Sequence, residues 1–105
     1  MILGPPAHTF DLHGMTVLEA ARAARHFLEA QRRARPGAVV RLVTGRGRGG
    51  GGAPIRTRVR ALLRAMREEG GVVSDYELEE GEGSFLVRLS AGGATSRRAP
   101  GRPRG

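Results

Sequence analysis

Cysteine, lysine and tryptophan are absent from this sequence of 105 residues. The lack of cysteine excludes disulfides, thiolate metal sites and a cysteine nucleophile. No apolar run approaches the about 18 residues that a membrane-spanning helix needs. The first residues, MILGPPAHTF, contain neither a basic segment nor a long apolar one. We therefore expect no signal peptide and a cytoplasmic protein without a membrane partner.

All of the positive charge comes from arginine: 18 arginines against 10 acidic residues give a formal net charge of +8. Arginine binds phosphate through two parallel hydrogen bonds. Codon bias is an alternative explanation for arginine in place of lysine, but it does not require an excess of base over acid. The charge predicts a polyanionic partner, nucleic acid first. Aromatic residues make up only 4%, which favours salt-sensitive binding through phosphate over base stacking.

The length allows one domain, which we place at residues 8–90 after an N-terminal extension at residues 1–7. Residues 91–105 are rich in glycine, proline and arginine and show no apolar periodicity. This composition predicts a disordered basic tail. The tail either adds non-specific attraction to phosphate or serves only to keep the chain soluble.

Four short segments have the composition of strands, at residues 8–12, 38–43, 72–78 and 84–90. Two amphipathic segments lie between them, so the predicted order is β-α-β-α-β-β. Right-handed crossovers make the first three strands parallel and put both helices on one side of the sheet, and the last two strands form a hairpin. The predicted fold is an α/β two-layer sandwich, with a four-stranded mixed sheet and two helices on one face.

The first helix should run from a capping box at Thr16 and Glu19 to about Ala34. Its apolar positions keep helical spacing and should face the sheet: Leu18, Ala21, Ala24, Phe27 and Leu28. The second helix is expected to begin at Ile55, directly after Pro54. Arginines line the outer side of both helices.

Two short segments place polar residues at the ends of predicted parallel strands: FDLHG at Phe10–Gly14 and TGRG at Thr44–Gly47. Such strand ends meet at one edge of a sheet, where ligands bind, so His13 should lie beside the glycine loop. Histidine changes protonation state near neutral pH, and Asp11 lies on the same side of an extended chain, where it can orient the imidazole. The alternative is a surface histidine at a strand end, with Asp11 bonded to turn amides.

The glycine-rich loop contains the G-x-G-x-x-G spacing of a dinucleotide site, at Gly45, Gly47 and Gly50. We reject that interpretation because the loop is expected to continue to Ile55 and because the motif follows the second strand of a short chain. A P-loop is excluded because no G-K-[S/T] follows.

The remaining interpretation of the glycine-rich loop is a phosphate-binding loop of another kind. Backbone amides of glycine can approach a phosphate closely, and Arg46 and Arg48 supply charge. An RGG-like flexible spacer is the alternative for residues 49–52. No group of histidines or carboxylates has metal-ligand spacing, so the sequence predicts no metal site.

The segments FDLHG and TGRG, in this order along the chain, resemble those of the Smr (small MutS-related) domain family. The resemblance rests on Asp-Leu-His-Gly at residues 11–14, Thr-Gly-Arg-Gly at residues 44–47 and a glycine turn before the final strand, and it covers about residues 8–89. It implies a fold similar to the C-terminal domain of translation initiation factor three. The family often has a tryptophan in the second helix and serine in the loop, and this chain has neither there.

Members of this family bind DNA or RNA, several cut it as endonucleases, and some act with ribosomes. The resemblance implies that Asp11 and His13 are active residues. It implies that Gly14, Thr44, Gly45 and Gly47 belong to the substrate-binding site, with Arg46 at a variable and often basic position. We expect an endonuclease with an RNA or structured DNA substrate, RNA being favoured because its 2′-hydroxyl can attack without a metal. No cofactor is predicted, although a divalent metal would help on DNA. The alternative is a non-catalytic module that binds RNA, DNA or a ribosome.

Overall fold

The computed structural model describes residues 3–45, 52–81 and 83–91. Its elements follow the predicted order, β-α-β-α-β-β: β1 (His8–Asp11), α1 (Val17–Ala34), β2 (Val39–Val43), α2 (Gly52–Glu69), β3 (Val73–Leu78) and β4 (Ser84–Leu89). Strand limits differ from the expected ones by a residue at the ends. The predicted disordered tail lies outside the described ranges, apart from residue 91, and stays a prediction.

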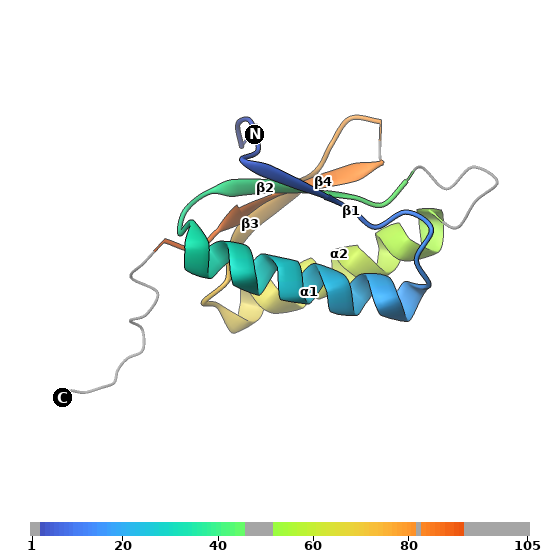
Figure 1. Cartoon of the computed structure of the whole chain (residues 1–105), viewed down its shortest axis with the longest axis horizontal. Coiled ribbons are helices and arrows are strands. Elements are labelled where there is room, and N and C mark those ends of the chain that lie inside the picture. Colours follow the sequence, from blue (N-terminus) through green and yellow to red (C-terminus); the bar gives the residue numbers. More distant parts are fainter. Residues whose placement is uncertain (1–2, 46–51, 82, 92–105) are drawn as a thin grey trace.

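The sheet has the strand order β1-β2-β4-β3. β1 and β2 are parallel, whereas β4 is antiparallel to both of its neighbours, β2 and β3. β1, β2 and β3 therefore run in one direction, and β3 and β4 form the expected hairpin. Both helices cover the same face (Figure 1). The predicted mixed sheet and two-layer sandwich are confirmed.

Alternation along the strands explains how the core forms. In β4, Phe85, Val87 and Leu89 point to the helices and are almost fully buried. The neighbouring strand β2 contributes Val40 and Leu42, which stand opposite Val87 and Phe85 and have no exposed surface. Their partners come mainly from α1 and α2: Ala20, Ala24, Leu28, Ile55, Val59, Leu63 and Met66. Burying each large side chain of this kind stabilises the fold by about 1.5–3 kcal/mol.

The start of α1 has the predicted capping box. The amide of Glu19 donates to the Thr16 hydroxyl at 3.1 Å, and the amide of Thr16 donates to the Glu19 carboxylate at 3.0 Å. The expectation that Leu18 faces the sheet is wrong, because this side chain is 54% exposed. Ala20, Ala21, Ala24 and Leu28 form the buried side of the helix, and Leu18 lies outside that side.

The start of α2 differs from the expected one. The helix begins at Gly52 rather than at Ile55, so Pro54 lies within its first turn. The first amides of a helix have no acceptor within it, and a proline there breaks no hydrogen bond. Residue 52 of the expected flexible spacer thus belongs to α2, and residues 49–51 lie outside the part of the chain that the structure describes.

The N-terminal segment crosses the sheet on the side away from the helices (Figure 1). Leu3 is 7% exposed, and its amide donates to the Glu77 carboxylate of β3 at 3.4 Å. Leu86, which stands opposite Glu77 in the sheet, is also buried. Within the described ranges, neither helix is long and apolar enough to span a membrane.

Candidate functional site

The ends of β1 and β2 form one rim of the sheet. The two strands are parallel, with Asp11 beside Val43, and the amide of Leu12 extends the pairing by donating to the Val43 carbonyl at 2.7 Å. The residues that follow, His13 after β1 and Thr44 after β2, therefore leave the sheet side by side. The hydrogen bond from Leu12 to Val43 brings the backbones of the two segments together, and the expected position of His13 beside the glycine loop stays a prediction.

Each residue of the Asp-Leu-His-Gly segment has a distinct environment. Leu12 is completely buried in the core, so it fixes the backbone between the exposed side chains of Asp11 and His13. Replacing a buried leucine of this kind by alanine costs about 2–5 kcal/mol. Gly14 has a φ of 86°, and the amide of Met15 donates to the Leu12 carbonyl at 3.2 Å, which closes a tight turn. Glycine adopts this backbone conformation without strain.

Asp11 and His13 form the polar pair of the rim. One carboxylate oxygen, Oδ1 of Asp11, accepts from the amide of His13 at 2.9 Å and contacts Nδ1 of its ring at 2.7 Å. Partial burial alone would raise the pKa of the Asp11 carboxyl, but the hydrogen bonds and charge of His13 outweigh it and lower that pKa below 3.8. An ionised carboxylate only accepts hydrogen bonds, so Nδ1 is the donor in this pair.

The pair is open to solvent. The side chain of His13 is 70% exposed and that of Asp11 is 51% exposed. With Nδ1 engaged, the second ring nitrogen, Nε2, is the atom that can exchange a proton with a bound molecule. The arrangement is therefore that of an oriented imidazole whose reactive nitrogen is accessible. His8 and His26 are exposed as well, but no carboxylate within the described residues pairs with either ring.

The other half of the rim is the start of the glycine loop. Thr44 has no exposed surface, and its amide donates to the Gly83 carbonyl at 2.9 Å. The amide of Gly45 donates to the same carbonyl at 3.0 Å. The Thr44 hydroxyl contacts the carbonyls of Gly45 at 3.2 Å and Gly83 at 3.4 Å. The loop is thus tied at its origin to the turn between β3 and β4.

This anchoring changes what Gly45 can do. The predicted phosphate site relied on backbone amides of the loop glycines, but in the structure the amide of Gly45 already has an acceptor in Gly83. Gly45 instead makes a bend, with a φ of 88°. The other predicted loop residues, Arg46, Gly47 and Arg48, lie outside the described residues, and their role as phosphate ligands stays a prediction.

Gly83 is a rim residue that sequence reasoning did not single out as part of the site. The glycine turn before the last strand was noted only as a family mark. The register of β2 with β4 brings Ser84 opposite Val43, and this pairing places the Gly83 carbonyl beside Thr44. This contact could have been predicted from the sequence only if the pairing of β4 with β2 had been known. Residues 3–45, 52–81 and 83–91 contain no group of three or more histidine, cysteine or acidic residues able to hold a metal ion.

Comparison with known proteins identifies the class of this domain. The family model of the Smr domain matches residues 10–90. The chain therefore belongs to the Smr domain family, and the resemblance seen in the sequence is confirmed.

A solved structure supports the same assignment. The chain is similar to the crystal structure of the Smr domain of Thermus thermophilus MutS2, with 28% sequence identity and a TM-score of 0.65. The similarity covers 79% of this chain and 98% of that one. No curated protein matches the chain.

Proposed function

We propose that this Smr domain binds nucleic acid at the rim formed by β1 and β2 and cleaves it as an endonuclease. The observation that carries the proposal is the 2.7 Å contact between Nδ1 of His13 and Oδ1 of Asp11, because it orients an exposed imidazole at the edge of the sheet where ligands bind. Family membership and the net charge of +8 support a nucleic-acid substrate.

On RNA, His13 would act as a general base. Its Nε2 takes the proton of a 2′-hydroxyl, and the 2′-oxygen then forms a bond to the adjacent phosphorus. The bond from phosphorus to the 5′-oxygen breaks, and water supplies a proton to that oxygen. The products are a 2′,3′-cyclic phosphate and a 5′-hydroxyl. Asp11 stabilises the imidazolium that forms, because its charge lies 2.7 Å from Nδ1.

The phosphate itself needs positive partners. We assign this role to Arg46 and Arg48 and to the amide of Gly47, which follow Gly45 in the loop. The Gly45 bend and the buried Thr44 set the direction in which the loop leaves the sheet. Donors aimed at the phosphate oxygens would stabilise the charge that builds on them during the reaction. Gly14 forms the turn that presents His13 to the same phosphate.

A non-catalytic module is the second candidate function, and one observation favours it. The Asp11 carboxylate also accepts from the His13 amide at 2.9 Å, a contact that any well-formed turn could use for stability alone. In that case the rim binds RNA, DNA or a ribosome through charge, and the imidazole makes only an ordinary polar contact.

The test compares His13→Ala with His26→Ala. Both histidines are exposed, but His26 lies in the middle of α1, away from the rim. Cleavage of end-labelled RNA and DNA is measured with chelator and with added divalent metal, and affinity is measured on uncut strands. The enzyme hypothesis predicts that His13→Ala lowers the cleavage rate about 100-fold or more while affinity holds. Purified protein that binds but does not cut in any of these conditions supports the binding module instead.

A further inference from the structure

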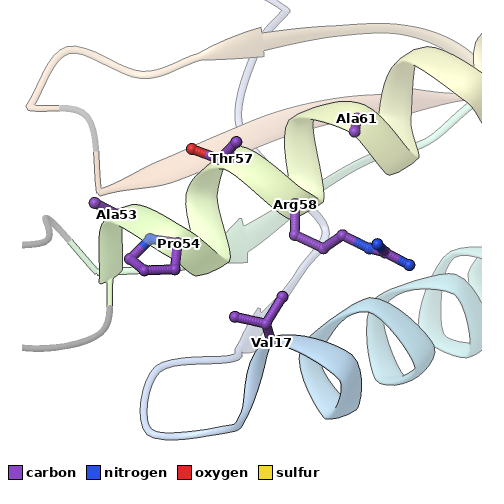
Figure 2. A pocket seen from close by; sticks show the side chains of 6 residues that line it. All are labelled: Val17, Ala53, Pro54, Thr57, Arg58 and Ala61. Atoms are coloured by element: carbon purple, nitrogen blue, oxygen red, sulfur yellow. The ribbon is translucent and has the colours of Figure 1, made fainter.

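An open hollow lies between the start of α1 and the N-terminal half of α2 (Figure 2). Its volume is about 570 Å³. One wall comes from the start of α1 and the other from successive turns of α2. The lining residues are Val17, Ala53, Pro54, Thr57, Arg58 and Ala61.

The hollow belongs to the same end of the molecule as the rim. The turn that carries His13 leads into α1, and the loop that starts at Thr44 leads into α2, so both helices begin beside the ends of β1 and β2 (Figure 1). Val17 is the first residue of α1. A polymer whose phosphate lies against His13 is therefore bound at the same end of the molecule as the hollow.

The lining has a distinctive chemistry. Most of it is apolar, from the side chains of Val17, Pro54 and the two alanines, and no carboxylate contributes. Val17 is 38% exposed, and its neighbour Leu18 is 54% exposed, so apolar surface is left open here. The polar groups are the Thr57 hydroxyl and the Arg58 guanidinium, which extends along the hollow above Val17 (Figure 2). No acidic side chain among the described residues forms an ion pair with Arg58.

We propose that this hollow receives one unpaired base of the strand that is bound at the rim, an inference that rests on the proposed nucleic-acid function. A base has apolar faces that match the Pro54 ring and the flat guanidinium of Arg58, and acceptor atoms on its edge for the Thr57 and Arg58 donors. An aliphatic segment would cover the apolar wall but would leave the guanidinium without a partner. The positive charge at the mouth also suits a polyanion.

The proposal explains how a chain with few aromatic residues can still contact bases. Its four aromatic side chains are used within the fold: Phe10 packs on Phe27 at 4.9 Å between ring centres, and Tyr76 packs on the buried Phe85 at 6.5 Å. The hollow supplies an arginine and a proline where other proteins use aromatic rings. A base can enter only after it leaves the helical stack, so single strands and bulges are preferred over uninterrupted duplex.

The experiment measures affinity at one salt concentration for a short oligouridylate, its backbone-matched abasic analogue and the corresponding DNA pair. Loss of the bases should weaken binding of the parent protein about fivefold or more, the lower end of the effect of one stacked base. Ala61→Leu fills the hollow without changing charge, and Arg58→Gln removes its cation. Both variants should bind the normal strand as weakly as the parent binds the abasic one. Arg60→Gln makes the same charge change on another side of α2 and should keep the discrimination.

The outcomes separate the inference from the function on which it rests. Equal binding of normal and abasic strands by the parent protein, with unchanged affinity in Ala61→Leu, would leave the nucleic-acid function intact and overturn the base pocket. Failure to bind any strand would overturn both. A dimer in sedimentation that Ala61→Leu dissociates would assign the hollow to a second copy of the chain. Thermal unfolding of each variant checks the fold, and Arg58→Gln serves as the independent test where Ala61→Leu is unstable.

Discussion

The amide and the ring of His13 both bond to one oxygen of Asp11, at 2.9 and 2.7 Å. A single carboxylate therefore fixes the backbone of the turn and the orientation of the imidazole together. Leu12, buried between these two exposed residues, prevents the turn from shifting away from the sheet. A substitution at Asp11 can therefore separate its role in the turn from its role beside the imidazole.

Asp11→Asn should preserve the turn and impair the chemistry. The asparagine oxygen can still accept from the His13 amide, but it carries no charge to stabilise the imidazolium. We expect the cleavage rate to fall on the order of 100-fold, the lower end of the range of general acid–base effects, with affinity unchanged. Single-turnover cleavage and binding on the same RNA measure the two effects. Wild-type cleavage by Asp11→Asn would assign the pair to the fold alone.

Gly14→Ala should strain the turn. The φ of 86° is unfavourable for any residue with a Cβ, although nothing within 4 Å would collide with the added atom. The free energy of unfolding should drop by about 1 kcal/mol, measured by denaturant titration. Gly14→Asn is the matched control, because asparagine tolerates positive φ better and should lose less. Equal stability of the alanine variant and the parent would contradict the turn geometry.

Thr44→Val should loosen the origin of the glycine loop without leaving a cavity. Valine matches the shape of threonine but lacks the hydroxyl that contacts the carbonyls of Gly45 and Gly83. The expected loss of stability is about 0.5–1.5 kcal/mol, the usual net contribution of one hydrogen bond. Thermal and denaturant unfolding give the value. An unchanged stability would mean that the two backbone amides alone hold the loop to Gly83.

Glu79→Gln should reduce the sensitivity of the fold to acid. The guanidinium of Arg41 binds the Glu79 carboxylate at 2.7 and 3.0 Å, and Ser84 donates to it at 2.5 Å. The hydrogen bond from Arg41 is the main reason why the pKa of Glu79 lies below 4.5, since burial acts in the opposite direction.

The sign of the pH effect follows from this lowered pKa. The contribution of Glu79 to stability is complete above pH 4.5 and is lost as the pH falls through the lower pKa of the folded state. At neutral pH, Glu79→Gln should cost about 1 kcal/mol, because the pair is partly exposed. Between neutral pH and pH 3 the variant should lose less stability than the parent. Glu80→Gln removes a carboxylate at an exposed neighbouring position and is the matched control for the charge change.

Much of the architecture was accessible from the sequence because it depends on local patterns. The capping box at Thr16, the alternation at Phe85, Val87 and Leu89 and the turn at Gly14 each involve residues close together in the chain. The common edge reached by the ends of β1 and β2 followed from the parallel direction expected for these strands.

The features that escaped prediction depend on distant partners. The insertion of β4 between β2 and β3 is decided by pairing across the sheet, and the engaged amide of Gly45 follows from that pairing through Gly83. Leu18 is three residues before Ala21, a helical spacing that predicted a buried side chain, yet it lies outside the buried side of α1. The hollow beside Arg58 is lined by residues of both α1 and α2, so it depends on how the two helices pack.

The central position of β4 has a consequence for how the domain forms during synthesis. Among the described strands, β4 (Ser84–Leu89) is translated last, yet it joins the half-sheet of β1 and β2 to β3. A nascent chain that ends before Ser84 has no strand between β2 and β3, and no pairing of β4 with β2 holds the Gly83 carbonyl beside Thr44. Cooperative folding of the whole sheet therefore requires translation of β4, and a premature stop codon upstream of it would leave β2 and β3 without their shared antiparallel partner.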